Sequence, residues 1–145
     1  MIVIDTDVAT FHQRGHGATF EAIVENITGR NDSIWITIVT FEEQMRGWLA
    51  KCAKSRTPEE YIDNARHLRK ALDYYRHRSI LDFDSAAAMH YRSLSHLKTR
   101  IGTMDLRIAA IARSRDATLV THNTSDFRQV PGLRIEDWTI PPKKP

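Results

Sequence analysis

Short aliphatic runs rich in β-branched residues alternate along the chain with longer segments whose apolar residues recur at helical spacing. The aliphatic runs predict buried strands, and they lie at 2–5, 33–39, 80–83, 117–121 and 133–138. The longer segments predict helices, which we expect at about 20–27, 40–55, 57–76, 84–94 and 105–115. Strands that alternate with helices form right-handed crossovers and a parallel sheet covered on both faces. We therefore expect an α/β fold with a central, mainly parallel sheet.

Two short motifs add local detail to this pattern. In TPEE, Thr57 suits the N-cap of a helix and Pro58 suits its first position, while two acids follow in the first turn. The stretch QRGHG, residues 13–17, predicts a turn or short helix after the first strand. It matches neither the dinucleotide-binding nor the Walker glycine pattern, so no phosphate-binding loop of those kinds is expected.

Length and composition indicate an ordinary globular protein of 145 residues. We expect a single domain over residues 1–140 and a flexible, proline- and lysine-rich tail over 141–145. One cysteine, Cys52, excludes an intrachain disulfide and a cysteine-based zinc site. Neither a membrane-spanning apolar run nor a leader peptide is recognisable, so we expect a cytoplasmic protein without a membrane partner. The net charge of +3 is compatible with a polyanionic partner and equally with a solvated basic surface.

Acidic side chains follow most of the predicted strands. The carboxyl ends of parallel strands meet at one edge of a sheet, and ligands bind there. Clustered carboxylates repel one another unless cations are present, and hard oxygen ligands favour Mg²⁺ or Mn²⁺ over zinc. Carboxylate-bound Mg²⁺ is suited to phosphodiester cleavage. The acids in question, with one amide, are Asp5, Asp7, Glu42, Glu43, Asp82, Asp84, Asp105, Asn123 and Asp126.

Several of these acids also have a structural interpretation. Thr40 and Glu43 fit a capping box, in which Glu43 bonds back to the backbone. Asp7 fits the cap of a short helix, and Asp84 fits an N-cap. Asp105 fits a first-turn acid favoured by the helix dipole. Asp5 is the hardest to explain in this way, because it follows directly on a strand that the sequence predicts to be fully buried.

Other catalytic chemistries have little support in the sequence. The seven histidines are scattered and no two have metal-ligand spacing, which favours surface or hydrogen-bonded roles. The serines lie in no nucleophile elbow, which argues against a serine hydrolase.

Four blocks of sequence, in order, resemble one known family. They are IDTD near the start, TFEEQMRGWL after the second strand, RIGTMDLRIAAIA in a late helix and TLVTHNTSDFRQVPGLRIEDW at the end. Together they resemble the PIN domain and, more closely, the VapC-type toxins of bacterial type II toxin–antitoxin operons. The resemblance implies a three-layer α/β/α domain that acts as a Mg²⁺- or Mn²⁺-dependent endoribonuclease and inhibits translation and growth. It also implies a homodimer and a cognate antitoxin partner.

The resemblance also implies roles for individual residues. Asp5, Glu43 and Asp105 stand at the positions of the family's metal ligands and catalytic carboxylates. A fourth acid is common near the start of the last motif, where this chain has Asn123, and Asp126 is the candidate to replace it. We expect the remaining candidates to lie in a second shell or to contact substrate, and they are Thr6, Asp7, Thr121, Asn123, Arg46, Arg100 and Arg107. Thr6 and Thr121 are expected to bond a bound water or a phosphate.

Three alternatives remain open from the sequence. A nuclease acting on DNA would use the same carboxylates. A binding module with a degenerate metal site centred on Asn123 would bind RNA or antitoxin without cleaving. A phosphatase that forms an aspartyl-phosphate on Asp5 also begins with a strand followed by DxD, but no lysine follows at a suitable strand end.

Overall fold

The computed structural model describes residues 1–143 and contains a five-stranded sheet in the order β3-β2-β1-β4-β5. All four pairs of neighbouring strands are parallel, as the sequence predicts. β1 lies at the centre, and it pairs with β2 through Ile4 and Ile36 and with β4 through Ile4 and Val120. The strands are β1 (Ile2–Ile4), β2 (Ile34–Thr37), β3 (Ile80–Leu81), β4 (Thr118–Val120) and β5 (Arg134–Glu136).

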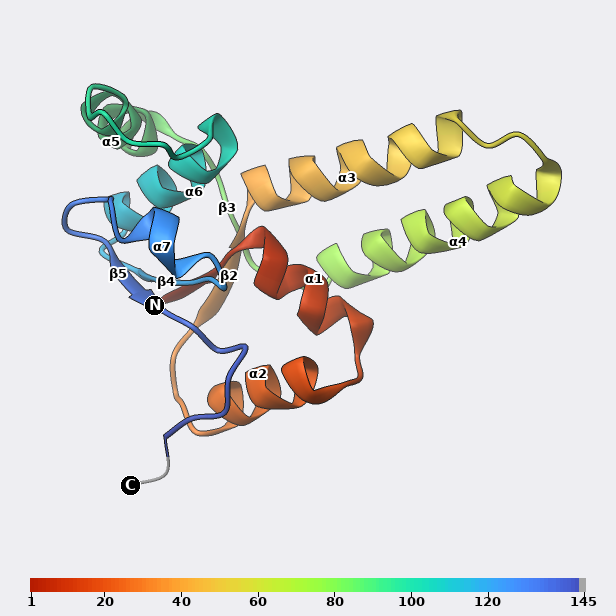
Figure 1. Ribbon diagram of the computed structural model, residues 1–145, viewed down its shortest axis with the longest axis horizontal. Coiled ribbons are helices and arrows are strands. Elements are labelled where there is room, and N and C mark those ends of the chain that lie inside the picture. Colours follow the sequence, from red (N-terminus) through yellow and green to blue (C-terminus); the bar gives the residue numbers. More distant parts are fainter. Residues whose placement is uncertain (144–145) are drawn as a thin grey trace.

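Helices cover both faces of this sheet, which gives the predicted three-layer α/β/α arrangement (Figure 1). On one face, Val3 and Leu119 pack against the buried side of α6. On the other face, Ile2, Ile4 and Val120 pack against α1 and α2. The helices are α1 (Thr6–Arg14), α2 (Ala18–Thr28), α3 (Ile38–Ala53), α4 (Pro58–Tyr75), α5 (Ser85–Ser95), α6 (Thr103–Ser114) and α7 (Thr124–Phe127).

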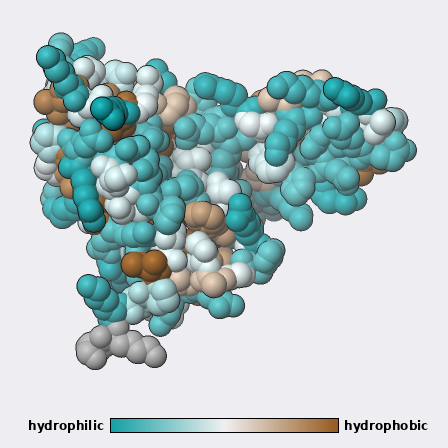
Figure 2. All heavy atoms as spheres, in the orientation of Figure 1, coloured by the Kyte–Doolittle hydropathy of each residue, from teal (hydrophilic) through white to brown (hydrophobic). Residues whose placement is uncertain are grey.

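The helices α3 and α4 pack against each other and project from the sheet as an arm (Figure 1). The predicted start of α4 is confirmed, because the Thr57 side chain accepts a hydrogen bond from the Glu60 backbone N–H at 3.1 Å and Pro58 is the first helical residue. Hydrophilic residues cover most of the arm on the face drawn in Figure 2. Only the sheet-proximal half of this helix pair therefore contributes to the main core, through residues such as Tyr75.

The boundary between β2 and α3 differs from the sequence prediction. A strand was expected over 33–39, but β2 ends at Thr37 and α3 begins at Ile38. The cause is the short partner strand, since β1 ends at Ile4 opposite Ile36 and leaves the following residues of β2 without a central neighbour. Thr37, rather than Thr40, is the N-cap and accepts a hydrogen bond from the Thr40 backbone N–H at 3.1 Å. The predicted capping box of Thr40 and Glu43 is therefore wrong.

Within residues 1–143, no helix combines the length and the hydropathy that crossing a bilayer requires. Residues 141–143 are exposed and have no regular structure. The remainder of the predicted tail, 144–145, lies outside the described residues.

Candidate metal-binding and catalytic site

A hollow of about 300 Å³ opens at the carboxyl-terminal edge of the sheet. Four acids from three different helices or helix caps line it, because α1 follows β1, α3 follows β2, and the start of α6 faces the same edge. We call this hollow the acidic pocket, and its lining residues are Asp5, Thr6, Asp7, Thr10, Glu43, Asp105 and Asn123. The topology therefore brings together acids that lie up to a hundred residues apart in the sequence.

Asp5 is the most deeply buried of these acids, with 4% of its surface exposed. It is the N-cap of α1, and its carboxylate accepts hydrogen bonds from the Thr6 backbone N–H at 2.6 Å and from the Thr121 hydroxyl at 2.8 Å. Burial, reinforced by the neighbouring charge of Asp7, raises the pKa of Asp5 from 3.8 to about 7. Two hydrogen bonds are thus not enough to offset the cost of a buried negative charge.

Asp7 lies in the first turn of α1 and does not cap it, so the predicted capping role is wrong. The reason is that the strand ends one residue earlier than expected, which makes Asp5 the cap. The Asp7 carboxylate accepts hydrogen bonds from the backbone N–H groups of Val8 at 2.6 Å and His122 at 3.2 Å. Burial raises the pKa of Asp7 as well. Asp7 therefore connects α1 to the loop after β4.

Glu43 is held by the polar side chains between α1 and α3. The Thr6 hydroxyl donates a short hydrogen bond to Glu43 Oε2 and lies 3.2 Å from the Thr40 hydroxyl. Thr40 Oγ1 in turn lies 3.2 Å from Thr37 Oγ1, and Thr37 and Thr40 are fully buried. Thr6 and Thr121 both donate to carboxylates, and their expected contacts with water or a phosphate stay predictions. Each threonine orients an acid, because its hydroxyl is directed into the protein.

Asp105 lies in the first turn of α6 and also lines the acidic pocket. Its position therefore suits a first-turn acid that interacts with the helix dipole and equally a carboxylate of the site. Burial raises the pKa of Asp105, and the charges of Glu43, Asp126 and Asp7 raise it further. Asp126 itself does not line the pocket, and its Oδ2 accepts a hydrogen bond from the Asn123 side-chain amide at 2.8 Å. Asn123 thus stands between the pocket and the remaining acid.

The charges of the acidic pocket are not neutralised by basic side chains. In the part of the chain that the structure describes, Asp5, Asp7, Glu43, Asp105 and Asp126 form no ion pair with lysine, arginine or histidine side chains. Over the same 143 residues, no three acids, histidines or cysteines already stand in the geometry of a metal-ligand cluster. The donor set consists of oxygens with unmet negative charge, which fits a hard divalent cation after small side-chain movements.

A family model described as the PIN domain matches residues 2–133 of this sequence. The chain belongs to the PIN-domain family. Within it, the chain is similar to the tRNA(fMet)-specific endonuclease VapC of Shigella flexneri, with 31% identity over 141 residues that cover 94% of this chain and 97% of that relative. It is also 28% identical to the ribonuclease VapC2 of Rickettsia felis over 141 residues, which cover 94% of this chain and 96% of that relative.

A solved structure supports the same relationship. VapBC2 from Rickettsia felis, bound to a DNA fragment from its promoter, matches this PIN domain with a TM-score of 0.70 and 27% identity. The match covers 95% of this chain and 99% of that chain. The similarity therefore extends over the whole sheet and all the elements that carry the acidic pocket.

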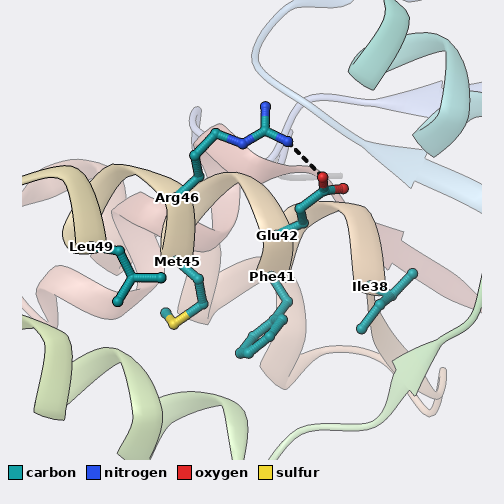
Figure 3. Close-up of a pocket in the computed structure, with 6 residues that line it drawn as sticks. All are labelled: Ile38, Phe41, Glu42, Met45, Arg46 and Leu49. Carbon is teal, nitrogen blue, oxygen red and sulfur yellow. Dashed lines mark hydrogen bonds and ion pairs between the residues drawn. The ribbon is translucent and has the colours of Figure 1, made fainter.

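Some predicted site residues lie elsewhere on the PIN domain. Figure 3 shows Arg46 bonded to Glu42 beside an apolar hollow of about 530 Å³ on α3. The pair is exposed, with 2.6 Å between Arg46 Nη2 and Glu42 Oε1, so Arg46 does not face the acids as expected. Asp82 is exposed, and Asp84 caps α5 as predicted. Arg107 extends toward the Met104 sulfur at 3.3 Å rather than into the acidic pocket.

Sequence reasoning missed two contributors to the PIN-domain site. Thr10 lines the acidic pocket and accepts a hydrogen bond from the Gln44 side-chain amide at 2.9 Å. The carbonyl of Gln44 accepts a hydrogen bond from the buried Tyr75 hydroxyl at 2.7 Å, so one glutamine joins α1, α3 and α4. His122, for which the sequence predicts only a surface or hydrogen-bonded role, supplies the backbone N–H that binds Asp7. The sequence signal for Thr10 was its helical spacing from Thr6. No sequence signal indicated the contact between His122 and Asp7.

Proposed function

We propose that this PIN-domain protein is a Mg²⁺- or Mn²⁺-dependent endoribonuclease that acts as the toxin of a toxin–antitoxin pair. The observation that carries the proposal is the acidic pocket, in which four carboxylates meet without a basic partner among the described residues. Such unmet charge is costly and is retained where a divalent cation is to be bound. The names of the relatives, an endonuclease and a ribonuclease, favour RNA cleavage by that cation site.

In this proposal Asp5, Glu43 and Asp105 hold the metal ion. When bound, the ion supplies Lewis acidity toward a phosphate oxygen and toward water. Thr121 keeps the Asp5 carboxylate oriented, and Thr6 does the same for Glu43. Asp126 contributes through Asn123, whose amide it holds at 2.8 Å. The chain thus provides carboxylate oxygens at one edge of the sheet, and small side-chain movements would bring them into the geometry of a metal site.

The biological role follows from the same comparison. The similar solved structure is of a VapBC assembly, so we propose that a cognate antitoxin binds this chain and silences it. Cleavage of RNA then stops translation and growth when the antitoxin is lost. We further propose that the protein works as a homodimer. A catalytically weak binding module is the alternative, and it is favoured by the amide of Asn123 at the position of the fourth acid.

The experiment is a cleavage assay on purified protein with tRNA, ribosomal RNA and matched DNA as substrates, with Mg²⁺, Mn²⁺ or EDTA. We expect metal-dependent cleavage of RNA but not of DNA, and its loss in Asp105→Asn. Asp84→Asn is the matched control, because it also removes a carboxylate from the first residues of a helix but lies outside the pocket. Cleavage of DNA would establish the DNA-directed alternative, and binding without cleavage would establish the binding module.

The same variants test the toxin role in cells. Induction of the wild-type chain alone should arrest growth, and Asp5→Asn should abolish the arrest while the protein still melts cooperatively. Asparagine keeps the shape and capping ability of Asp5 but removes its charge. Equal toxicity of wild type and Asp5→Asn would overturn the catalytic assignment.

A further inference from the structure

A second hollow lined by α1 lies nearer the C-terminal end of that helix than the acidic pocket does. It measures about 230 Å³ and lies at the turn between α1 and α2, where it is lined by Phe11, Arg14, His16 and the segment 17–20. The turn is the QRGHG stretch, which matches neither the dinucleotide-binding nor the Walker glycine pattern. Gly15 and Gly17 have φ angles of 72° and 93°, which side-chain-bearing residues rarely adopt. No atom lies within 4 Å of a Cβ built on either glycine, so the turn borders open space.

A series of contacts links residues of the acidic pocket to residues of the second hollow. His122 binds Asp7 through its backbone N–H, and its exposed ring meets the Phe11 ring at 6.2 Å and 87°. On the Phe11 ring lies the Arg14 guanidinium, 5.2 Å from the ring centre. An aromatic ring with an attached cation therefore separates the acidic pocket from the second hollow.

The positive charge of Arg14 has no acidic partner among the described residues. Arg14 is exposed and forms no ion pair with any of the described residues 1–143, unlike Arg30, Arg46 and Arg115. The guanidinium is also held in place by stacking rather than freely extended. A cation fixed beside an aromatic ring has the chemistry that binds a phosphate and a base of a single RNA strand together.

The spacing fits one strand that serves both hollows. Asp7 and Arg14 are separated by seven residues of the same helix, which corresponds to about 10 Å along its axis. We propose that the hollow formed by Phe11, Arg14 and His16 is a substrate subsite, which binds a nucleotide of the RNA flanking the phosphate that is cleaved. This inference rests on the proposed ribonuclease function and adds to it a residue set that recognises the substrate strand.

Arg14→Gln tests the subsite in initial-rate measurements of RNA cleavage. We expect KM to rise roughly tenfold, as for loss of one charge-assisted contact, while kcat falls much less. The dependence of kcat/KM on salt should also become less steep, because one phosphate contact is lost. Phe11→Leu, which keeps an apolar side chain in the core, should raise KM in the same direction.

Arg56→Gln is the matched control, since it removes another exposed arginine, in the segment between α3 and α4 at the far end of the arm (Figure 1). It should leave KM, kcat and the salt dependence within about twofold of wild type. Thermal melting of all variants identifies any loss of folding, and the salt dependence separates a lost phosphate contact from a loosened structure.

Three outcomes distinguish the possibilities. If the wild type cleaves RNA and Arg14→Gln matches Arg56→Gln, the subsite is wrong and the ribonuclease stands. If the wild type cleaves no RNA, the proposed function fails and the subsite with it. If Arg14→Gln weakens binding of a glutamate-rich peptide but not KM for RNA, the hollow is a protein-docking site and the inference is overturned.

Discussion

Thr121 and Asp5 form a buried hydrogen bond across the two central strand ends, with 2.8 Å between the Thr121 hydroxyl and Asp5 Oδ2. The register of the sheet determines this pair. Ile4 of β1 is aligned with Val120 of β4, so the residues that come next, Asp5 and Thr121, lie beside each other. Thr121 is fully buried and also accepts a hydrogen bond from the Asn123 backbone N–H at 3.0 Å. One hydroxyl thus orients an acid of the pocket and the loop that carries Asn123.

Thr121→Val should lower both stability and metal affinity, although the two side chains have nearly the same volume. Valine keeps the shape but leaves Asp5 Oδ2 and the Asn123 N–H without a partner, which should lower the free energy of unfolding by about 1–3 kcal/mol. The pKa of Asp5 should rise further, because the Thr121 hydrogen bond favours the charged form. Urea denaturation and metal-titrated cleavage measure both effects, and we expect a higher half-saturating Mn²⁺ concentration.

Thr121→Ser is the control for that experiment, since serine keeps the hydroxyl and loses only a methyl group. It should cost about 1 kcal/mol of stability through the small cavity and retain the metal response of the wild type. Equal metal responses of the valine and serine variants would mean that the hydroxyl does not orient Asp5.

The metal-free protein should lose stability as pH rises. The pKa of Asp5 is 3.8 when unfolded and about 7 when folded, so between these values the folded state binds more protons than the unfolded state. Stability therefore falls from about pH 4 to about pH 7 and levels off above, and the raised pKa values of Asp7 and Asp105 add to the same slope. The contribution of Asp5 has an upper bound of about 4 kcal/mol.

Asp5→Asn should flatten that slope and raise the metal-free melting temperature near pH 7.5. Chemical denaturation in EDTA at several pH values measures it. Asp84→Asn serves as the control, because Arg115 lowers the pKa of the exposed Asp84 and places its titration below this range. A slope unchanged by Asp5→Asn would show that Asp5 is already charged at low pH and that its burial is compensated.

The sheet was predictable because its strands are short, continuous aliphatic runs and its crossovers leave few topologies. Val3 and Leu119 are fully buried, and the composition of their strands already indicates burial on both faces. Strand direction predicted that acids gather at one edge of the sheet, and the structure places Asp5, Glu43 and Asp105 there. The choice of these three among all the candidate acids came from the resemblance to the PIN domain.

The orientation of individual side chains was not predictable in the same way. Thr37, Thr40 and Thr6 meet between α1 and α3, and which of them caps the helix depends on where β1 ends. Arg46 faces Glu42 because both lie on the same exposed side of α3, four residues apart. Such choices arise from tertiary contacts that no single segment encodes.

Glu43→Gln should abolish most RNA cleavage, whereas Glu42→Gln should leave cleavage unchanged. Glu43→Gln still accepts the Thr6 hydrogen bond and relieves repulsion of Asp105, so metal-free stability should equal or exceed that of the wild type. Glutamine is a far poorer Mg²⁺ ligand, and RNA cleavage should fall by orders of magnitude. Thermal melting and initial rates check the two expectations.

Glu42→Gln removes only the exposed ion pair with Arg46, which contributes about 0–0.5 kcal/mol. It should therefore cleave and melt as the wild type does. Normal cleavage by Glu43→Gln together with an inactive Glu42→Gln would contradict the orientation of α3. Normal cleavage by both variants would mean that Glu42 and Glu43 are structural and that Asp5, Asp105 and Asp126 form the metal site.

Asn123→Asp should convert the amide of the acidic pocket into a further metal ligand. Asn123 lines the pocket and donates to Asp126 Oδ2 at 2.8 Å, so an aspartate here brings two carboxylates into contact. Without metal, that repulsion should lower the free energy of unfolding by about 1–3 kcal/mol. With Mn²⁺, the added negative charge should increase the rise in melting temperature and lower the half-saturating Mn²⁺ concentration for cleavage.

The double variant Asn123→Asp/Asp126→Asn is the matched control, because it exchanges the carboxylate and the amide at constant charge. Their hydrogen bond can form in the reverse direction, so metal-free stability should return toward that of the wild type. If the carboxylate at 123 is a ligand, the stronger Mn²⁺ response should persist in the double variant. A Mn²⁺ response that stays at the wild-type level in both variants would mean that position 123 does not reach the metal, and Asp126 would then act only by holding the loop.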